Sequence, residues 1–254
     1  MRVIVLGSGT STPHPQRTSS SFWLETENGS LLLDISPSSL HRMAQEKCEW
    51  ANLDAIWVSH FHLDHFGGLA PFLFGTKHAA ETRNRKKPLT VFGPMRLKEI
   101  FDAINSANNY RLMQQPFDIL FQEVEPSEEF EFLPNLKART YKTQHTDESL
   151  AVRIESANSS LVFTSDTGFD EGLISFSRDV DLLLIECSFL YIKPSQKHLN
   201  LPEAIYIANK SNAKRSLLTH LYPEWDSVDI EKEMARLNSM CACVPTFDGL
   251  CLEI

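Results

Sequence analysis

The sharpest chemical signal in the chain is a run of three histidines and one aspartate, His60-Phe61-His62-Leu63-Asp64-His65. It directly follows an apolar run over residues 55–59, which predicts a buried strand. Crowding four polar side chains at a strand end costs free energy unless something binds them, because each neutral imidazole needs a hydrogen-bond partner. A divalent metal ion supplies that compensation. We therefore expect His60 and His62 to face one ion, and Asp64 and His65 to face a second.

Further metal-competent side chains stand at the ends of other apolar runs. They are His145, Asp166, Glu186 and His220. Because α/β folds assemble their sites from residues at the carboxyl ends of strands, we expect these side chains to gather in one place. A lone His145 or His220 would more often be an ordinary hydrogen-bonded residue. With the 60–65 cluster already in the chain, we expect both to join the same site.

Short apolar runs and amphipathic stretches that could position these residues recur along the whole chain. The expected strands are 2–6, 20–25, 30–34, 55–59, 90–92, 119–124, 137–143, 150–154, 160–164, 182–186, 216–219 and 249–254. The expected helices are 38–48, 67–74, 95–105, 202–211 and 228–240. The first half reads as hairpin-like strands and the second as alternating strand and helix, which together predict an α/β sandwich with helix-covered sheets. No linker-like segment interrupts the pattern, so we predict one domain over residues 1–254.

Composition narrows the class of protein further. The 254 residues include 24 Lys and Arg against 33 Asp and Glu, a net charge of −9, and 42% of the residues are hydrophobic. These values are ordinary for a globular protein and exclude long disorder, collagen and coiled coil. The acidic balance argues against a protein that coats nucleic acid through bulk charge.

The N-terminal segment and the cysteines indicate the compartment. The apolar run at residues 3–6 is too short for a secretory signal, and no later run approaches a membrane span. Five cysteines, an odd number, lie mostly in apolar runs. Free buried thiols are typical of a reducing compartment. We expect a cytoplasmic protein with no membrane partner.

The order of these residues along the chain resembles the motifs of the metallo-β-lactamase superfamily. The resemblance spans about residues 2–223 and rests on Asp34, the 60–65 cluster, His145, Asp166 and His220. It implies an αββα four-layer sandwich with a dinuclear metal site between its sheets. The ligands it implies are His60, His62 and His145 for one metal, Asp64, His65 and His220 for the other, and Asp166 as the bridge. Asp34 would order the histidine loop. Zinc is the metal we expect, with manganese and iron as alternatives that a His/Asp set also accepts.

Within the superfamily, the chain resembles ribonuclease Z and its phosphodiesterase relatives. The opening Leu6-Gly7-Ser8-Gly9-Thr10 looks like the start of that branch, and Glu186-Cys187-Ser188-Phe189 resembles its His-Glu-Ala-Thr motif, with Ile185 in place of the histidine. The later block Lys197-His198 adds a histidine that Glu186 would orient. This implies hydrolysis by a metal-bound hydroxide, whose formation two cations favour at neutral pH. His198 would protonate the leaving oxygen, and Asp64 could orient or deprotonate the attacking water.

The spacing of the motifs bears on the substrate. Ribonucleases Z that process tRNA carry an inserted arm, expected between the motifs matching His145 and Asp166, but residues 146–165 suffice only for two strands and a turn. We therefore expect a small phosphodiester, such as a cyclic nucleotide or a cyclic phosphate. A tRNA 3′-end endoribonuclease is the alternative. Its basic surface could come from the polar stretch 76–88, although we expect that stretch to be a solvated loop. The basic residues there are Arg83, Arg85, Lys86 and Lys87.

Other classes fit less well. Aspartate rather than cysteine at position 166 disfavours a β-lactamase, and histidine rather than glutamate at position 62 disfavours a di-iron flavoprotein. A thioesterase would share the ligands, but residues 221–254 leave no room for the helical substrate domain of that branch. A non-catalytic metal-binding scaffold would have no use for a proton donor at His198. A homodimer is an expectation of the resemblance alone.

Overall fold

The computed structural model describes residues 1–237 and 242–254, which form two seven-stranded sheets. In spatial order the first sheet consists of β14 (Cys251–Glu253), β1 (Arg2–Gly7), β2 (Ser21–Thr26), β3 (Gly29–Leu33), β4 (Ala55–Trp57), β5 (Leu89–Pro94) and β6 (Ile119–Val124). The second consists of β13 (Ala242–Pro245), β12 (Arg215–Thr219), β11 (Leu182–Glu186), β10 (Ser160–Phe163), β9 (Leu150–Glu155), β8 (Leu136–Lys142) and β7 (Glu129–Leu133).

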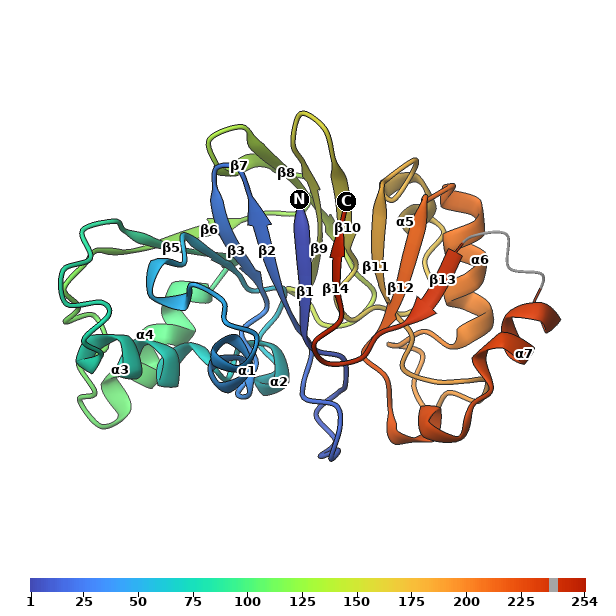
Figure 1. The fold of residues 1–254 in the computed structure, drawn as a ribbon, viewed down its shortest axis with the longest axis horizontal. Coiled ribbons are helices and arrows are strands. Elements are labelled where there is room, and N and C mark those ends of the chain that lie inside the picture. The colour runs from blue at the N-terminus through green and yellow to red at the C-terminus, as the bar shows by residue number, and fades with distance from the viewer. Residues whose placement is uncertain (238–241) are drawn as a thin grey trace.

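Helices cover the outer face of each sheet, as Figure 1 shows. The first sheet carries α1 (Ser39–Gln45), α2 (Leu63–Phe66), α3 (Leu69–His78) and α4 (Leu97–Ala107). The second carries α5 (Gly172–Phe176), α6 (Leu201–Ser211) and α7 (Ile230–Arg236). Short 3₁₀ helices, η1 (Trp50–Asn52) and η2 (Pro223–Ser227), complete the described elements.

The four layers follow from the period-two alternation of apolar side chains along each strand. In β1, Val3 and Val5 point into the core between the two sheets, whereas Ile4 and Leu6 point into the core beneath the helices of the first sheet. In β11, alternate leucines divide in the same way between the central core and the core under α5 and α6. The expected αββα sandwich is therefore confirmed.

The sequence located the expected strands and helices to within a few residues and predicted part of their arrangement. Hairpin-like strands were expected in the first half, and β1, β2 and β3 do pair antiparallel, whereas β3, β4, β5 and β6 run parallel. A second antiparallel run extends from β7 to β10. Helices α2 and α5 and strands β7 and β13 were not expected; each has only four or five residues. The expected helix 228–240 appears as α7, and its residues 238–240 lie outside the described part of the chain.

Two segments bear on the substrate. Residues 146–165 are occupied by β9 and β10 with their turn, as the spacing predicted. In the basic stretch, Arg85 is not solvated as expected. Its guanidinium is buried, donates to the carbonyls of residues 51, 53, 87 and 88, and lies 4.2 Å from the ring centre of Phe117. Lys87 forms an ion pair with Asp54, so Arg83 and Lys86 are the exposed cations left in this stretch.

The last strand closes the first sheet against the first strand. β14 pairs antiparallel with β1, with Arg2 opposite Glu253, and both ends of the chain lie side by side in Figure 1. The loop before β14 holds Asp248, whose carboxylate accepts hydrogen bonds from Ser8 and Thr18. Among the described residues, no helix has the length and apolar character needed to cross a bilayer.

Candidate metal centre

The sequence-predicted residues meet where strands of both sheets end. Asp34 follows β3, His60 lies beyond the end of β4, and Asp166 follows β10 after a short turn. His145 and His220 follow β8 and β12 of the second sheet. Asp34 and His220 have positive φ values, 56° and 57°. Because this conformation costs a non-glycine residue of order 1 kcal/mol, the surrounding contacts must hold both turns in place.

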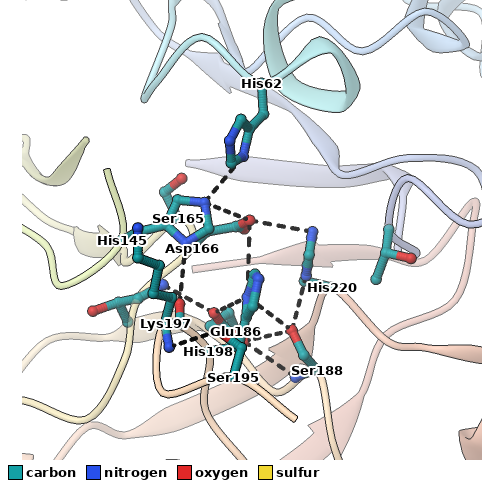
Figure 2. A network of polar contacts seen from close by, with 12 residues as sticks. His62, His145, Ser165, Asp166, Glu186, Ser188, Ser195, Lys197, His198 and His220 are labelled. Carbon is teal, nitrogen blue, oxygen red and sulfur yellow. Dashed lines mark hydrogen bonds and ion pairs between the residues drawn. The ribbon is translucent and has the colours of Figure 1, made fainter. Parts of the chain in front are cut away.

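Asp166 is the hub of the cluster (Figure 2). Its Oδ1 lies 3.3 Å from His65 Nε2. Its Oδ2 lies 3.4 Å from His220 Nε2, 3.6 Å from His145 Nε2 and 3.9 Å from His60 Nε2. One buried carboxylate thus faces four imidazoles, which suits a bridge between two ions.

The remaining predicted ligands close the two sides of the cluster. Asp64 Oδ2 lies 3.6 Å from the Nε2 atoms of both His65 and His220. On the opposite side, His62 Nδ1 lies 3.1 Å from His145 Nε2, although the His62 side chain is exposed. The structure thus brings together all seven side chains that the sequence nominated as ligands.

Unpaired buried atoms test whether this cluster fits a metal. His60 Nε2, His65 Nε2, His220 Nε2 and Asp166 Oδ1 are buried and make no hydrogen bond. Such atoms cost free energy when unsatisfied, and here the three imidazole nitrogens all lie within 3.9 Å of the Asp166 carboxylate. Two groups have ligand atoms mutually within 4.8 Å: His60, His62, His145 and Asp166, and Asp64, His65 and His220. Nitrogen and carboxylate donors in this number fit two divalent cations.

The other ring nitrogen of each buried histidine is held by a specific acceptor. His65 Nδ1 donates to Asp34 Oδ2 at 2.6 Å, and His60 Nδ1 donates to Ser59 Oγ at 3.0 Å. Asp34 also accepts from the Ser59 backbone and hydroxyl, both at 2.8 Å. Such partners fix the ring orientation and leave Nε2 free to coordinate. The position of Asp34 is therefore the one that the resemblance implied.

Acceptors from the segment between β11 and α6 hold the other two buried histidines. His145 Nδ1 donates to the carbonyl of Lys197 at 3.0 Å, and His220 Nδ1 donates to Ser188 Oγ at 2.9 Å. Sequence reasoning missed Ser59, Ser188 and the Lys197 carbonyl. A serine beside a strand end has no distinctive pattern, and a carbonyl acceptor has no side-chain signal at all.

His198 and Glu186 form a separate unit beside the cluster. His198 Nδ1 donates to Glu186 Oε1 at 2.9 Å, and the His198 ring stacks on that of His220 at 5.4 Å between centroids. His198, Asp166 and His220 also form a group with metal-ligand spacing. However, the His198 nitrogen that faces Asp166, at 4.0 Å, is Nδ1. Since Glu186 engages that nitrogen, His198 is better placed to carry a proton than to bind a metal.

Electrostatics in the metal-free cluster separate these roles. Burial raises the pKa of Asp166, but the charges of His220 and His65 outweigh burial and hold it well below its ordinary value. Burial lowers the pKa of His198, but the hydrogen bond to Glu186 and the charges of Glu186 and Asp166 raise it to about 9. Asp166 is therefore ionised and His198 protonated at neutral pH.

The fold and this cluster define the class of protein, a metal-dependent hydrolase of the metallo-β-lactamase superfamily. The sequence profile of the family described as "Anti-Pycsar protein Apyc1" matches residues 1–240. The chain therefore belongs to the Anti-Pycsar protein Apyc1 family.

Individual relatives agree with this class. The "Probable metallo-hydrolase YhfI" of Bacillus subtilis is 28% identical over 87% of each chain. Its crystal structure covers 100% of this chain and 98% of its own, at 23% identity and a TM-score of 0.83. A ribonuclease Z of Ignicoccus hospitalis is 31% identical over 62% of this chain and 50% of its own length. The short form of human tRNase Z shares the fold, with a TM-score of 0.79 at 18% identity over 100% of this chain and 99% of its own.

Proposed function

We propose that this chain hydrolyses a small phosphodiester, a cyclic nucleotide or a cyclic phosphate, at a centre of two divalent metal ions. The observation that carries the proposal is the contact of His198 Nδ1 with Glu186 Oε1, at 2.9 Å beside the ligand cluster, which also raises the pKa of His198. Hydrolysis of a diester expels an alkoxide that needs a proton, and His198 is a fixed donor at that place. We propose zinc as the resident metal, with manganese or iron as alternatives.

Each residue has a distinct task in this proposal. Two ions held by the cluster would supply an activated water and offset the negative charge of the phosphoryl group. Asp64, whose side chain is partly exposed, orients the attacking water through its carboxylate. His198 Nδ1 is occupied by Glu186, so the proton passes to the leaving oxygen from Nε2. Glu186 keeps the His198 ring aimed while that proton leaves.

The surroundings of the centre favour a small substrate over tRNA. The segment between His145 and Asp166 is taken up by β9 and β10, which leaves no room there for an RNA-gripping arm. The basic stretch offers little substitute, because Arg85 is buried and Lys87 is paired. A tRNA 3′-end endoribonuclease remains the alternative, supported by the likeness to ribonucleases Z.

The test is a panel of cyclic nucleotides, cyclic phosphates and precursor tRNA, each incubated with the zinc- or manganese-loaded protein. We expect the fastest turnover on a cyclic substrate. The double variant Arg83→Ala/Lys86→Ala should leave that rate unchanged. Metal bound in stoichiometric amount with no cleavage of any diester would contradict the proposal. Cleavage of precursor tRNA alone, lost in the double variant, would establish the alternative.

The assembly and location are part of the same proposal. We propose a homodimer on the resemblance alone. Light scattering should then give a mass near twice 28.9 kDa. We also propose one domain over residues 1–254 and a cytoplasmic location, which the free buried thiols of Cys48 and Cys187 support.

A further inference from the structure

A buried hydrogen-bond network surrounds the Glu186 carboxylate (Figure 2). Oε1 accepts from the Thr167 backbone at 2.9 Å and from His198 Nδ1 at 2.9 Å. Oε2 accepts from the Ser188 hydroxyl at 2.7 Å and from the backbones of Ser188 and Leu199, both at 3.2 Å. Since every partner is a donor, Glu186 acts only as an acceptor.

This arrangement fixes the direction of the hydrogen bonds at Ser188. A serine hydroxyl has one hydrogen to give, and the 2.7 Å contact with Glu186 uses it. The 2.9 Å contact between Ser188 Oγ and His220 Nδ1 must therefore be donated by the imidazole. A neutral imidazole with its hydrogen on Nδ1 has a lone pair on Nε2.

That lone pair points into the ligand cluster. His220 Nε2 is buried, lacks a hydrogen-bond partner, and lies 3.4 Å from Asp166 Oδ2 and 3.6 Å from Asp64 Oδ2. The opposite tautomer would place a hydrogen where a cation is to bind. The Ser188 hydroxyl thus decides which tautomer His220 adopts, and only one tautomer leaves Nε2 able to bind a metal.

We propose that Ser188 is a positioning residue that links the proton donor to the metal ligands. By donating to Glu186 and accepting from His220, its hydroxyl sets the tautomer of His220, while the same carboxylate holds His198. The inference rests on the proposed function for the role of His198. The effect on His220 concerns metal binding alone.

The chain offers a matched control for removing the hydroxyl. Ser177 is as buried as Ser188, at 0% exposure, and its hydroxyl has no hydrogen-bond partner. Ser177→Ala therefore makes the same chemical change away from the centre. Ser188→Thr retains a hydroxyl and serves as the conservative rescue.

The experiment measures zinc affinity by competition with a chelator for the wild type, Ser188→Ala, Ser188→Thr and Ser177→Ala. Loss of such a partner typically weakens metal binding ~10–100-fold, and we expect that loss in Ser188→Ala. We expect Ser188→Thr to restore most of the affinity and Ser177→Ala to match the wild type. Nitrogen-15 NMR of the zinc-loaded wild type should show the hydrogen of His220 on Nδ1.

Two results would overturn the role of Ser188: a Ser188→Ala affinity equal to that of Ser177→Ala, or a His220 hydrogen located on Nε2. Neither readout requires turnover. A wild type that binds zinc, shows the expected tautomer and cleaves no phosphodiester would sink the proposed function and leave the Ser188 assignment standing.

Discussion

The two sides of the proposed metal centre are built from similar side chains but supported differently. On each side, one histidine reaches a buried carboxylate through a serine hydroxyl: His60 through Ser59 to Asp34, and His220 through Ser188 to Glu186. The remaining histidines differ. His145 donates to the neutral carbonyl of Lys197, whereas His65 donates directly to the Asp34 carboxylate.

The difference indicates how the two sides hold a cation. A hydrogen bond to a carboxylate is about twice as strong as one between neutral groups, and it makes the imidazole a better electron donor. The Asp64 side also contributes a carboxylate ligand of its own. We therefore expect the two metals to bind unequally, with the His60 side losing its ion first when a chelator is added.

The largest effect should come from removing the group that both sides share. Asp166→Ala deletes the carboxylate that faces the imidazoles of four predicted ligands, so at least one metal should be lost. Hydrolysis should then slow about 10³-fold or more, which equals or exceeds the rate loss typical of removing one electrostatic donor. Elemental analysis and rate measurements check this. Retention of both metals would show that Asp166 does not bridge them.

The next largest effect should come from removing the proposed proton donor, His198. His198→Ala should leave metal content intact and slow the cleavage of diesters with poor leaving groups by about 10²–10⁴-fold. Diesters that release p-nitrophenolate, which needs no proton, should be affected much less. Comparing the two substrate types separates the roles, since equal losses on both would refute proton donation.

A smaller effect should distinguish the two sides directly. Asp34→Asn keeps the shape of the side chain but removes the charge that contacts His65 directly and His60 only through Ser59. Affinity should therefore fall ~10–100-fold, most for the metal on the Asp64 side. Chelator titration should then show the Asp64 side releasing its ion first, the reverse of the wild-type order. An unchanged order would mean that the charged support does not set the inequality.

The smallest effect concerns a single proton. In the metal-free protein, Glu186→Gln removes the charge, and weakens the hydrogen bond, that raise the pKa of His198 to about 9, so that pKa should fall. A histidine whose pKa in the folded protein lies above its ordinary value stabilises the fold at low pH. That stabilisation is lost as the pH rises through the raised pKa, here about 9. In the variant, His198 should therefore lose its proton, and the fold should lose this stabilisation, at a lower pH than in the wild type. An NMR titration of His198 checks the direction.

The sequence could predict the layers and the ligands for different reasons. The alternation of apolar side chains in segments such as β1 and β11 predicts the layers of the fold. The crowding of polar side chains from His60 to His65 predicts the ligands, because it costs free energy without a metal. Parallel pairing of β3 to β6 could not be read, because a short apolar run is the same in either direction. The acceptors Ser59 and Ser188 stayed hidden because their roles depend on turns brought together from distant segments.

The pairing of β14 with β1 also affects how the chain folds during its synthesis. A ribosome adding ~5–20 residues per second makes β1 before β14 and needs on the order of tens of seconds to pass from one to the other. Throughout that interval the outer edge of β1 lacks its neighbour, and Ser8 and Thr18 lack the Asp248 carboxylate. An open strand edge invites pairing with other chains. The growing polypeptide is therefore exposed to misassembly at this edge until β14 emerges.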